Sequence, residues 1–202
     1  MATWESIFPT PVMRSNIGRE FTNKERDYFE KLQAAPHANV FNVRSADTQV
    51  LESPQMQAIR SFVSEHLNQY AWKVISSDPR HEFYITQSWV NYTKTGQAHH
   101  RHIHTNSLIS GVLYLQAQKE VDRICFYRNA PSQIVVSDEQ LNCYNASSWT
   151  FDVGVGDLVL FPSNLTHGVE QTTGEHTRVS LAFNVFVRGE CGNKKRLNSL
   201  IV

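Results

Sequence analysis

A cluster of histidines gives this sequence its clearest chemical signal. His99, His100, His102 and His104 lie within six residues, and His167 follows in a later segment. Neutral imidazole is the commonest protein ligand for transition metals, and residues i and i+2 of a β-strand point to the same face. We therefore expect His102 and His104 to reach one metal ion from one strand, while His167 completes the site from a second strand. Three nitrogen ligands leave coordination positions open, as metal-ion catalysis requires.

The alternation of a regular strand divides the four clustered histidines. His100, His102 and His104 would share one face, and His99 would lie on the other. A turn-like Thr-Asn-Ser sequence follows His104. The pair next to this break, His102 and His104, is therefore predicted to bind the metal, with His100 supporting it from behind. The competing interpretation is a solvated loop that is merely rich in histidine.

An arginine near the end of the chain adds a second chemical signal. Arg178 lies eleven residues after His167, on the polar face of a mostly apolar predicted strand. A buried guanidinium without an anionic partner costs several kcal/mol. We therefore expect either an internal Asp or Glu, or a carboxylate-bearing ligand that Arg178 holds in a bidentate pair. Ser180, two residues further on the same face, would add a hydroxyl group to such a ligand site.

The N-terminal part of the chain carries helical signals. Thr22 and Glu25 form a capping-box pattern in front of a first helix, and Ser53 with Pro54 marks the start of a second. The apolar residues that follow these two signals at helical spacing are Tyr28, Phe29 and Leu32 in the first helix and Ile59, Phe62, Val63, Leu67 and Tyr70 in the second.

From about residue 82 the pattern changes to short segments rich in β-branched and aromatic residues. These predicted strands are Glu82–Tyr92, Ser107–Leu115, Arg123–Arg128, Gln133–Val136, Trp149–Val153, Leu158–Phe161 and Thr177–Arg188. Short strands separated by turns are typical of a β-sandwich or barrel. We predict one mainly β domain with N-terminal helices, with helical support over residues 1–80, a β core over 82–188 and a tail over 189–202.

The composition narrows the class of protein further. The chain has 19 basic and 19 acidic side chains, so it lacks the broad positive field that drives nucleic-acid binding. Three cysteines without a CxxC spacing fit a reduced compartment better than a disulfide scaffold. The sequence shows no signal peptide and no apolar run long enough to span a bilayer. We expect a soluble, cytoplasmic protein that binds neither nucleic acid nor membrane.

Five sequence stretches together resemble a known enzyme superfamily. These stretches are Ile7–Val12, Trp89–Tyr92, His102–Leu115, Gly156–Ser163 running on to His167, and Arg178–Asn184. The ordered set resembles the Fe(II)- and 2-oxoglutarate-dependent oxygenases of the prolyl-hydroxylase-like branch, and within them a group of small oxygenases from bacteria and bacteriophages. The resemblance implies a double-stranded β-helix, or jelly roll, over the core, and a location in the host cytoplasm if the chain comes from a phage.

The resemblance also implies roles for the metal-site residues. His102 and His167 match the two iron-binding histidines of the superfamily. His104 stands where most members have Asp or Glu, which departs from the usual triad of two histidines and one carboxylate.

The same resemblance assigns residues to the cosubstrate. Arg178 matches the residue that pairs with the distal carboxylate of 2-oxoglutarate, and Ser180 would assist it. Tyr114 matches a tyrosine that donates a hydrogen bond to the same carboxylate, and Tyr92 matches another that lines the cosubstrate pocket. For both tyrosines the alternative is packing in the core with a satisfied hydroxyl group.

The resulting functional hypothesis is an iron oxygenase. It would use Fe(II), 2-oxoglutarate and O₂ to couple oxidative decarboxylation of 2-oxoglutarate to hydroxylation of a small-molecule or peptide substrate, with a peptidyl or amino-acid-like C–H bond suggested by analogy. Two alternatives stay open: a three-histidine dioxygenase that needs no 2-oxoglutarate, and a catalytically inactive jelly-roll binding module. Exposed edge strands would allow a homodimer.

Overall fold

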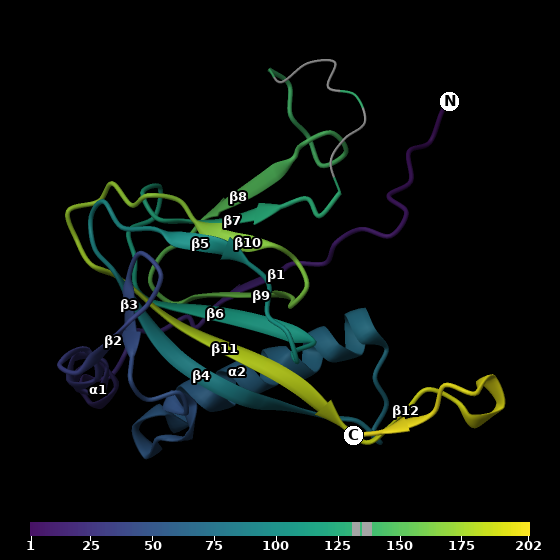
Figure 1. Ribbon diagram of the computed structural model, residues 1–202, viewed down its shortest axis with the longest axis horizontal. Coiled ribbons are helices and arrows are strands. Elements are labelled where there is room, and N and C mark those ends of the chain that lie inside the picture. The colour runs from purple at the N-terminus through teal and green to yellow at the C-terminus, as the bar shows by residue number, and fades with distance from the viewer. Residues whose placement is uncertain (131–133, 135–138) are drawn as a thin grey trace.

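Two antiparallel sheets that face each other dominate the structure, a computed structural model that describes residues 1–130, 134 and 139–202 (Figure 1). The large sheet has the strand order β1-β9-β6-β11-β4-β3-β2, and the small sheet has the order β5-β10-β7-β8. The large-sheet strands are β1 (Met13–Asn16), β2 (Pro36–Ala38), β3 (Val43–Ser45), β4 (Glu82–Thr93), β6 (Ile109–Gln116), β9 (Asp157–Pro162) and β11 (Arg178–Arg188). Those of the small sheet are β5 (His99–His102), β7 (Arg123–Tyr127), β8 (Ser148–Asp152) and β10 (His167–Val169).

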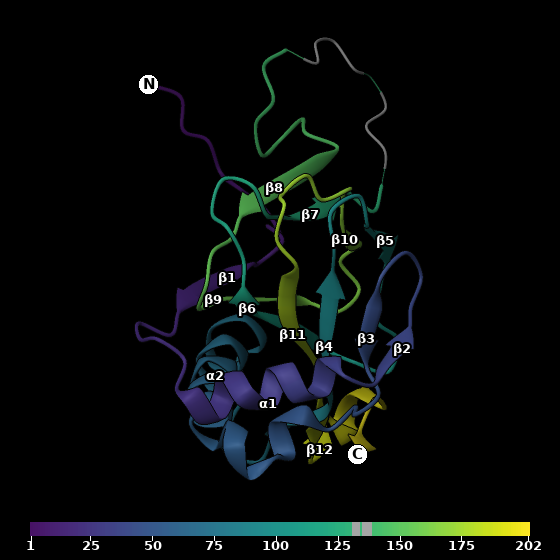
Figure 2. The same cartoon turned by 90° about the vertical axis from the view of Figure 1, so that its left-hand side faces the viewer.

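Helices cover the outer face of the large sheet (Figure 2). Helix α1 (Asn23–Gln33) begins at the predicted capping box, in which Thr22 caps the amide of Glu25 and the Glu25 carboxylate accepts a hydrogen bond from the amide of Thr22. Helix α2 (Gln57–Tyr70) follows a short 3₁₀ turn over Pro54–Met56. Ser53 makes no capping hydrogen bond with its side chain, so the predicted start signal opens this turn and α2 begins three residues later.

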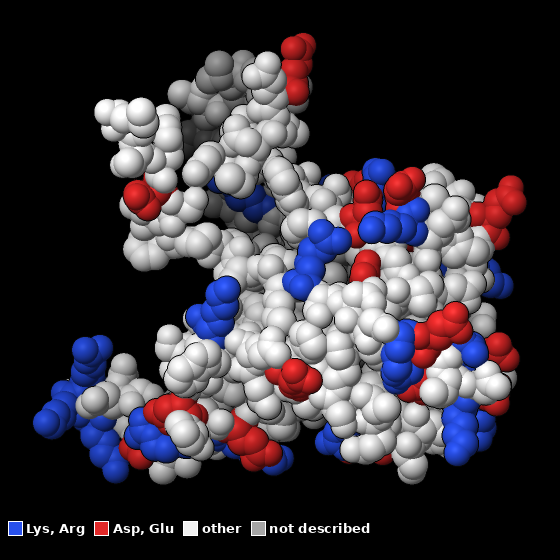
Figure 3. Space-filling model, turned by 180° about the vertical axis from the view of Figure 1, so that it is seen from behind, with Lys and Arg blue, Asp and Glu red and all other residues white. Residues whose placement is uncertain are grey.

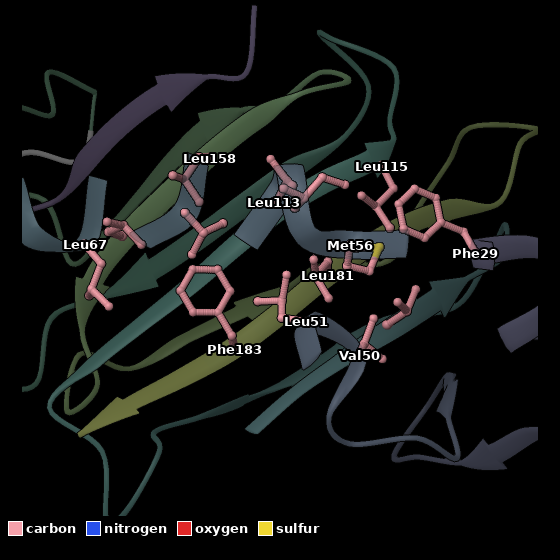
Figure 4. Packing of buried hydrophobic residues seen from close by; sticks show 14 of the residues in the cluster. Phe29, Val50, Leu51, Met56, Leu67, Leu113, Leu115, Leu158, Leu181 and Phe183 are labelled. Carbon is pink, nitrogen blue, oxygen red and sulfur yellow. The ribbon is translucent and has the colours of Figure 1, made fainter. Parts of the chain in front are cut away.

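The main core lies between the helices and the large sheet (Figure 4). Strand β11 shows how the alternation works, because Val179, Leu181 and Phe183 pack into this core while Arg178 and Ser180 point to the space between the two sheets. This division is the one predicted for the strand. Strand β11 therefore presents polar side chains to the space between the two sheets and apolar side chains to the main core.

A glycine permits the close packing of one large core side chain. Gly111 on β6 pairs with Phe183 on β11, and a Cβ atom on Gly111 would lie 2.1 Å from Cζ of the Phe183 ring. No side chain fits in that space, so glycine at this position lets the ring lie flat across the neighbouring strand.

Most predicted strands are confirmed, and several short strands were missed. The first 80 residues contribute β1, β2 and β3 to the large sheet in addition to their helices. The predicted tail contains a small hairpin of β12 (Glu190–Cys191) and β13 (Leu200–Ile201). The strand predicted over Gln133–Val136 lies outside the described residues, apart from Ile134.

The two facing antiparallel sheets form a double-stranded β-helix, as the resemblance implied. Acidic and basic side chains are interspersed over the face shown in Figure 3, in line with the zero net charge. Within the described residues, no helix is long and apolar enough to cross a membrane.

Candidate metal centre

A pocket between the two sheets brings together the histidines and the arginine that the sequence singled out. Strands of both sheets line it, and its lining includes Trp89, Asn91, His99, His102, His104, Ser110, Tyr114, His167, Arg178, Ser180 and Ala182. His102, His104 and His167 lie toward one end of this set, where His104 contacts Asn184, six residues after Arg178 on β11. Arg178 and Tyr114 lie together at the other, with the guanidinium 5.0 Å from the centre of the tyrosine ring.

His102, His104 and His167 form a compact triad. Their ring centres are 4.4 Å apart for His102 and His167, 4.9 Å for His102 and His104, and 5.2 Å for His104 and His167. One ligand nitrogen from each ring lies within 4.8 Å of the others. His167 is the first residue of β10 and pairs directly with His102, the last residue of β5. Pairing of two strand ends thus places two of the three imidazoles side by side.

His104 reaches the triad by a different route from the one predicted. Strand β5 ends at His102, so His104 lies in the following turn and does not share the strand with His102. Its backbone amide donates a hydrogen bond to the carbonyl oxygen of Ser163, at 2.9 Å. This bond fastens the turn to the segment before His167 and directs the His104 ring toward the other two.

The predicted parity of the cluster is wrong for His99. Between the pairs His102–His167 and His99–Val169, β5 advances three residues while β10 advances two, which is a β-bulge. The extra residue puts His99 on the same face as His102, where it lines the pocket and stacks on the His102 ring at 4.7 Å. His100 turns away from the pocket lining, and its backbone carbonyl accepts a hydrogen bond from Nδ1 of His102.

A glycine in the partner strand accommodates this bulge. A Cβ atom on Gly168 would lie 3.0 Å from the carbonyl oxygen of His99 and 3.2 Å from that of His100. The backbone of β5 therefore approaches β10 more closely than a larger residue at this position would allow. A second set of three histidines, His99, His100 and His102, also has ligand atoms near one another, but His100 is not part of the pocket lining.

Hydrogen bonds to the backbone set the tautomer of two of the triad imidazoles. Nδ1 of His102 lies 2.8 Å from the carbonyl oxygen of His100, and Nδ1 of His167 lies 2.9 Å from that of Leu165. A carbonyl oxygen only accepts, so each ring carries its proton on Nδ1 and keeps the Nε2 lone pair free.

The three imidazoles of the triad are neutral at pH 7. Burial lowers the pKa of His167 to about 3 and that of His104 to about 4, and it lowers the pKa of His102 as well. Neutral imidazole is the form that binds metals.

The arginine end of the pocket has polar atoms without partners. Arg178 is 3% exposed, and within the described residues it forms no ion pair with an Asp or Glu, contrary to one of the two expectations. Nε of Arg178, the hydroxyl of Tyr114 and Oδ1 of Asn91 are buried and lack hydrogen-bond partners. Such atoms are costly unless a ligand completes them. Ser180 is 2% exposed and lines the same space.

Tyr92 does not line the pocket, which corrects the role that the resemblance implied. It pairs with Val179 on β11 and packs into the core on the helix side of the large sheet. Its hydroxyl donates a hydrogen bond to the carbonyl oxygen of Phe29, at 2.8 Å. Neighbouring residues of a strand point to opposite faces, so it is Asn91 and Trp89, not Tyr92, that face the pocket.

Sequence reasoning assigned no role to Trp89 and Asn91, which line the pocket, or to Asn184, which contacts His104. The first two are spaced by two on β4, and the Trp89 ring lies 5.8 Å from that of His104. Asn184 lies on the polar face of β11, four residues after Ser180, and its side chain contacts His104. The alternation of β4 and β11 places these three residues on the faces that carry Arg178 and Ser180, so their spacing could have indicated them.

The donor set fits a divalent transition metal, and the other end of the pocket fits an anion. Three neutral nitrogen ligands with an open side suit a catalytic metal better than a closed structural site. A buried guanidinium and a buried hydroxyl without partners suit a carboxylate. The fold and site therefore define a jelly-roll protein with a candidate metal centre beside an anion pocket.

Comparison with known families agrees with this class. Residues 87–184 match the family described as "Putative 2OG-Fe(II) oxygenase". This region contains the histidine triad, Arg178 and Tyr114, and the match supports the resemblance to the Fe(II)- and 2-oxoglutarate-dependent oxygenase superfamily. The resemblance inferred from the motifs is thereby confirmed. No curated protein matches the chain.

Solved structures share the fold over most of the chain. An oxidoreductase of the 2OG-Fe(II) oxygenase family from Burkholderia pseudomallei is 13% identical, with a TM-score of 0.59 over 86% of this chain and 83% of its own. HygX from Streptomyces hygroscopicus, with nickel and 2-oxoglutarate bound, is also 13% identical, with a TM-score of 0.61 over 87% and 82%. A prolyl hydroxylase from Trichoplax adhaerens reaches 0.58 at 13% identity, over 87% and 83%. At this identity the similarity shows the fold.

Proposed function

We propose that this protein is an Fe(II)- and 2-oxoglutarate-dependent dioxygenase that hydroxylates an organic substrate. The observation that carries the proposal is the position of Arg178. This buried guanidinium has no acidic partner among the described residues and shares one pocket with three neutral imidazoles. A dicarboxylate that contacts the metal with one end and Arg178 with the other satisfies both halves of the pocket.

In this proposal the three imidazoles of His102, His104 and His167 hold Fe(II). Together with 2-oxoglutarate and O₂, the bound iron supplies the oxidative chemistry, which yields succinate, carbon dioxide and a hydroxylated C–H bond. The protein supplies binding, orientation and exclusion of water. The free Nε2 atoms of His102 and His167 are fixed by backbone acceptors before any metal binds.

Arg178, Ser180 and Tyr114 would bind the distal carboxylate of 2-oxoglutarate. Burial raises the pKa of Tyr114, against the opposing effect of the Arg178 charge, so its hydroxyl keeps its proton and can donate to a carboxylate. Asn91 faces the same space and has an unpartnered oxygen. HygX, a protein with this fold, binds nickel and 2-oxoglutarate, which supports placing a keto acid here.

The imidazole of His104 in place of a carboxylate changes the charge of the centre. A set of three neutral ligands leaves the full +2 charge on the metal, whereas the usual triad reduces it by one. The stronger positive field favours binding of the 2-oxoglutarate dianion. An imidazole binds a metal through a single nitrogen, so other groups must orient the His104 ring.

We infer a peptidyl or amino-acid-like substrate from the prolyl-hydroxylase-like resemblance, supported by the shared fold of the Trichoplax adhaerens enzyme. The absence of nucleic-acid and membrane partners, the homodimer, the bacterial or phage origin and the cytoplasmic location stay predictions.

Anaerobic titration tests the proposed function. Addition of 2-oxoglutarate to the protein loaded with Fe(II) is expected to produce the weak visible charge-transfer band of an Fe(II)–keto-acid chelate, and admission of O₂ should then yield succinate. Oxygen consumption that needs iron but not 2-oxoglutarate, without the band, would indicate the three-histidine dioxygenase. Iron binding with neither the band nor oxygen consumption, over a broad panel of substrates, would indicate a binding module.

A further inference from the structure

A chain of hydrogen-bonded side chains runs from His104 into the fold behind the metal centre. Nδ2 of Asn184 lies 3.4 Å from Nδ1 of His104, and Oδ1 of Asn184 lies 3.1 Å from Oγ of Ser110. Oγ of Ser110 is 2.8 Å from Oγ of Ser163, which is 2.7 Å from Oγ of Ser107. The Ser107 hydroxyl ends the chain at the backbone: its Oγ lies 3.1 and 3.2 Å from two carbonyl oxygens and accepts a hydrogen bond from the amide of Val185.

The protons of this chain can be counted because its middle is closed to water. Ser110 is 2% exposed and Ser163 is 1% exposed. Each serine hydroxyl has one proton to donate. Two backbone carbonyl oxygens face Ser107 and can only accept, so we assign the proton of Ser107 to the backbone. With this assignment Ser163 donates to Ser107, and Ser110 donates to Ser163.

This assignment turns the Asn184 amide relative to the structure, in which Nδ2 faces His104 and Oδ1 faces Ser110. Ser110 has only a lone pair left toward Asn184, so the amide must present its NH₂ group to Ser110 and its carbonyl oxygen to His104. With Oδ1 toward Ser110, the Ser110 proton would go to Asn184, and the series of contacts from Asn184 to the backbone would need four hydroxyl protons from three serines. The amide nitrogen and oxygen are nearly equal in size, so the surrounding hydrogen bonds decide between the two orientations.

We propose that Asn184 is a positioning residue that sets the tautomer of His104. Its carbonyl oxygen accepts a hydrogen bond from Nδ1–H of His104, which leaves the Nε2 lone pair free. His102 and His167 are held in the same tautomer by backbone carbonyl oxygens. The side chain of Asn184 thus does for the residue in the turn what the backbone does for the two residues in the strands.

The tautomer of His104 can be measured in the metal-free protein. Its role in metal binding through Nε2 rests on the proposed function. The test is ¹⁵N NMR of histidine-labelled, metal-free protein at pH 7.5, in which the two ring nitrogens of His104 report which one carries the proton. We expect the proton on Nδ1. Ser163→Ala interrupts the chain without touching the His104 ring and frees the Ser110 proton for the Asn184 oxygen. The amide then turns, and the proton of His104 should move toward Nε2.

Two further variants separate this role from general stability. Ser45→Ala removes a buried serine hydroxyl elsewhere in the large sheet and should leave the His104 tautomer unchanged. Asn184→Leu removes the acceptor and should weaken Co(II) binding, followed by its visible absorption, by about 10–100-fold.

The proposal is overturned by a wild-type His104 with its proton on Nε2, by a tautomer that Ser163→Ala leaves unchanged, or by unchanged Co(II) affinity in Asn184→Leu. A proton on Nδ1 in a wild-type protein that binds no Co(II) would support the tautomer and contradict the proposed function.

Discussion

The two ends of the pocket differ in how complete they are. At the histidine end, Nδ1 of His102 and Nδ1 of His167 already have backbone acceptors. At the arginine end, Nε of Arg178 and the hydroxyl of Tyr114 have no partner. These polar atoms at the histidine end are hydrogen-bonded in the free protein, whereas those at the arginine end need a ligand to bind them. Variants at the two ends should therefore fail in different ways.

The largest expected effect comes from the histidine end. His167→Ala removes a ligand that is 6% exposed and leaves the other two imidazoles with an incomplete triad. We expect Fe(II) affinity to fall by more than about 100-fold, beyond the range seen when only a supporting residue is lost. Anaerobic equilibrium dialysis measures it. His37→Ala, on the exposed strand β2, is the matched control, and equal losses in both variants would contradict the assignment.

A change at the arginine end should separate cosubstrate binding from metal binding. Arg178→Ala removes the cation from a buried pair and should raise the KM for 2-oxoglutarate by about 100-fold, because loss of one partner of a buried charge pair costs 2–5 kcal/mol. Fe(II) affinity should stay within about threefold of the wild type. Arg188→Ala changes an exposed arginine at the far end of the same strand and should alter neither quantity. Normal succinate production by the Arg178→Ala protein would remove that residue from the site.

A subtler variant sharpens the comparison at the same end. Tyr114→Phe deletes a buried hydroxyl that has no partner in the free protein, so the free energy of unfolding should not decrease. A hydrogen bond to a charged group contributes 1.5–3 kcal/mol, so 2-oxoglutarate affinity should fall by about tenfold or somewhat more. Urea unfolding and anaerobic titration measure the two effects. Destabilisation with unchanged 2-oxoglutarate affinity would indicate a packing role instead.

The smallest expected effect is a pH dependence that belongs to the histidine end. The pKa of His167 is lowered from 6.5 to about 3 by burial, so between these values the unfolded chain binds more protons than the folded one. The stability contribution is therefore fully present above about pH 6.5 and is lost as the pH falls toward 3. Each fully buried histidine accounts for up to about 1.4 kcal/mol per pH unit.

Urea midpoints of the metal-free protein at pH 7.5 and pH 5.0 measure this loss. The midpoint should be lower at pH 5.0, and His167→Gln should reduce the difference between the two values. A midpoint that does not change over this range would show that the imidazoles are not buried in neutral form.

The two ends also differ in how far the sequence predicted them. Strand β11 follows a regular alternation, so the polar face with Arg178 and Ser180 was predicted correctly from parity alone. The same rule failed for His99, because a bulge in β5 adds one residue against β10 and reverses the face. The bulge depends on the close approach of Gly168 in another strand, which no local pattern in the 99–104 segment reveals.

Pairing between strands explains the other differences. Tyr92 lies opposite Val179, so its direction follows from an apolar residue 87 positions away in the sequence and not from its own neighbours. The strands β1, β2 and β3 are three or four residues long, too short for periodicity to distinguish them from loops. The capping box of α1, by contrast, is local and was predicted correctly.

The most direct test of the account is a crystal structure of the protein soaked anaerobically with Fe(II) and 2-oxoglutarate. It should show iron within roughly 2.2 Å of one nitrogen from each of His102, His104 and His167, and the distal carboxylate paired with Arg178. Iron bound instead by His99, His100 and His102, or a 2-oxoglutarate molecule that leaves Arg178 without a partner, would contradict the assignment of the two ends.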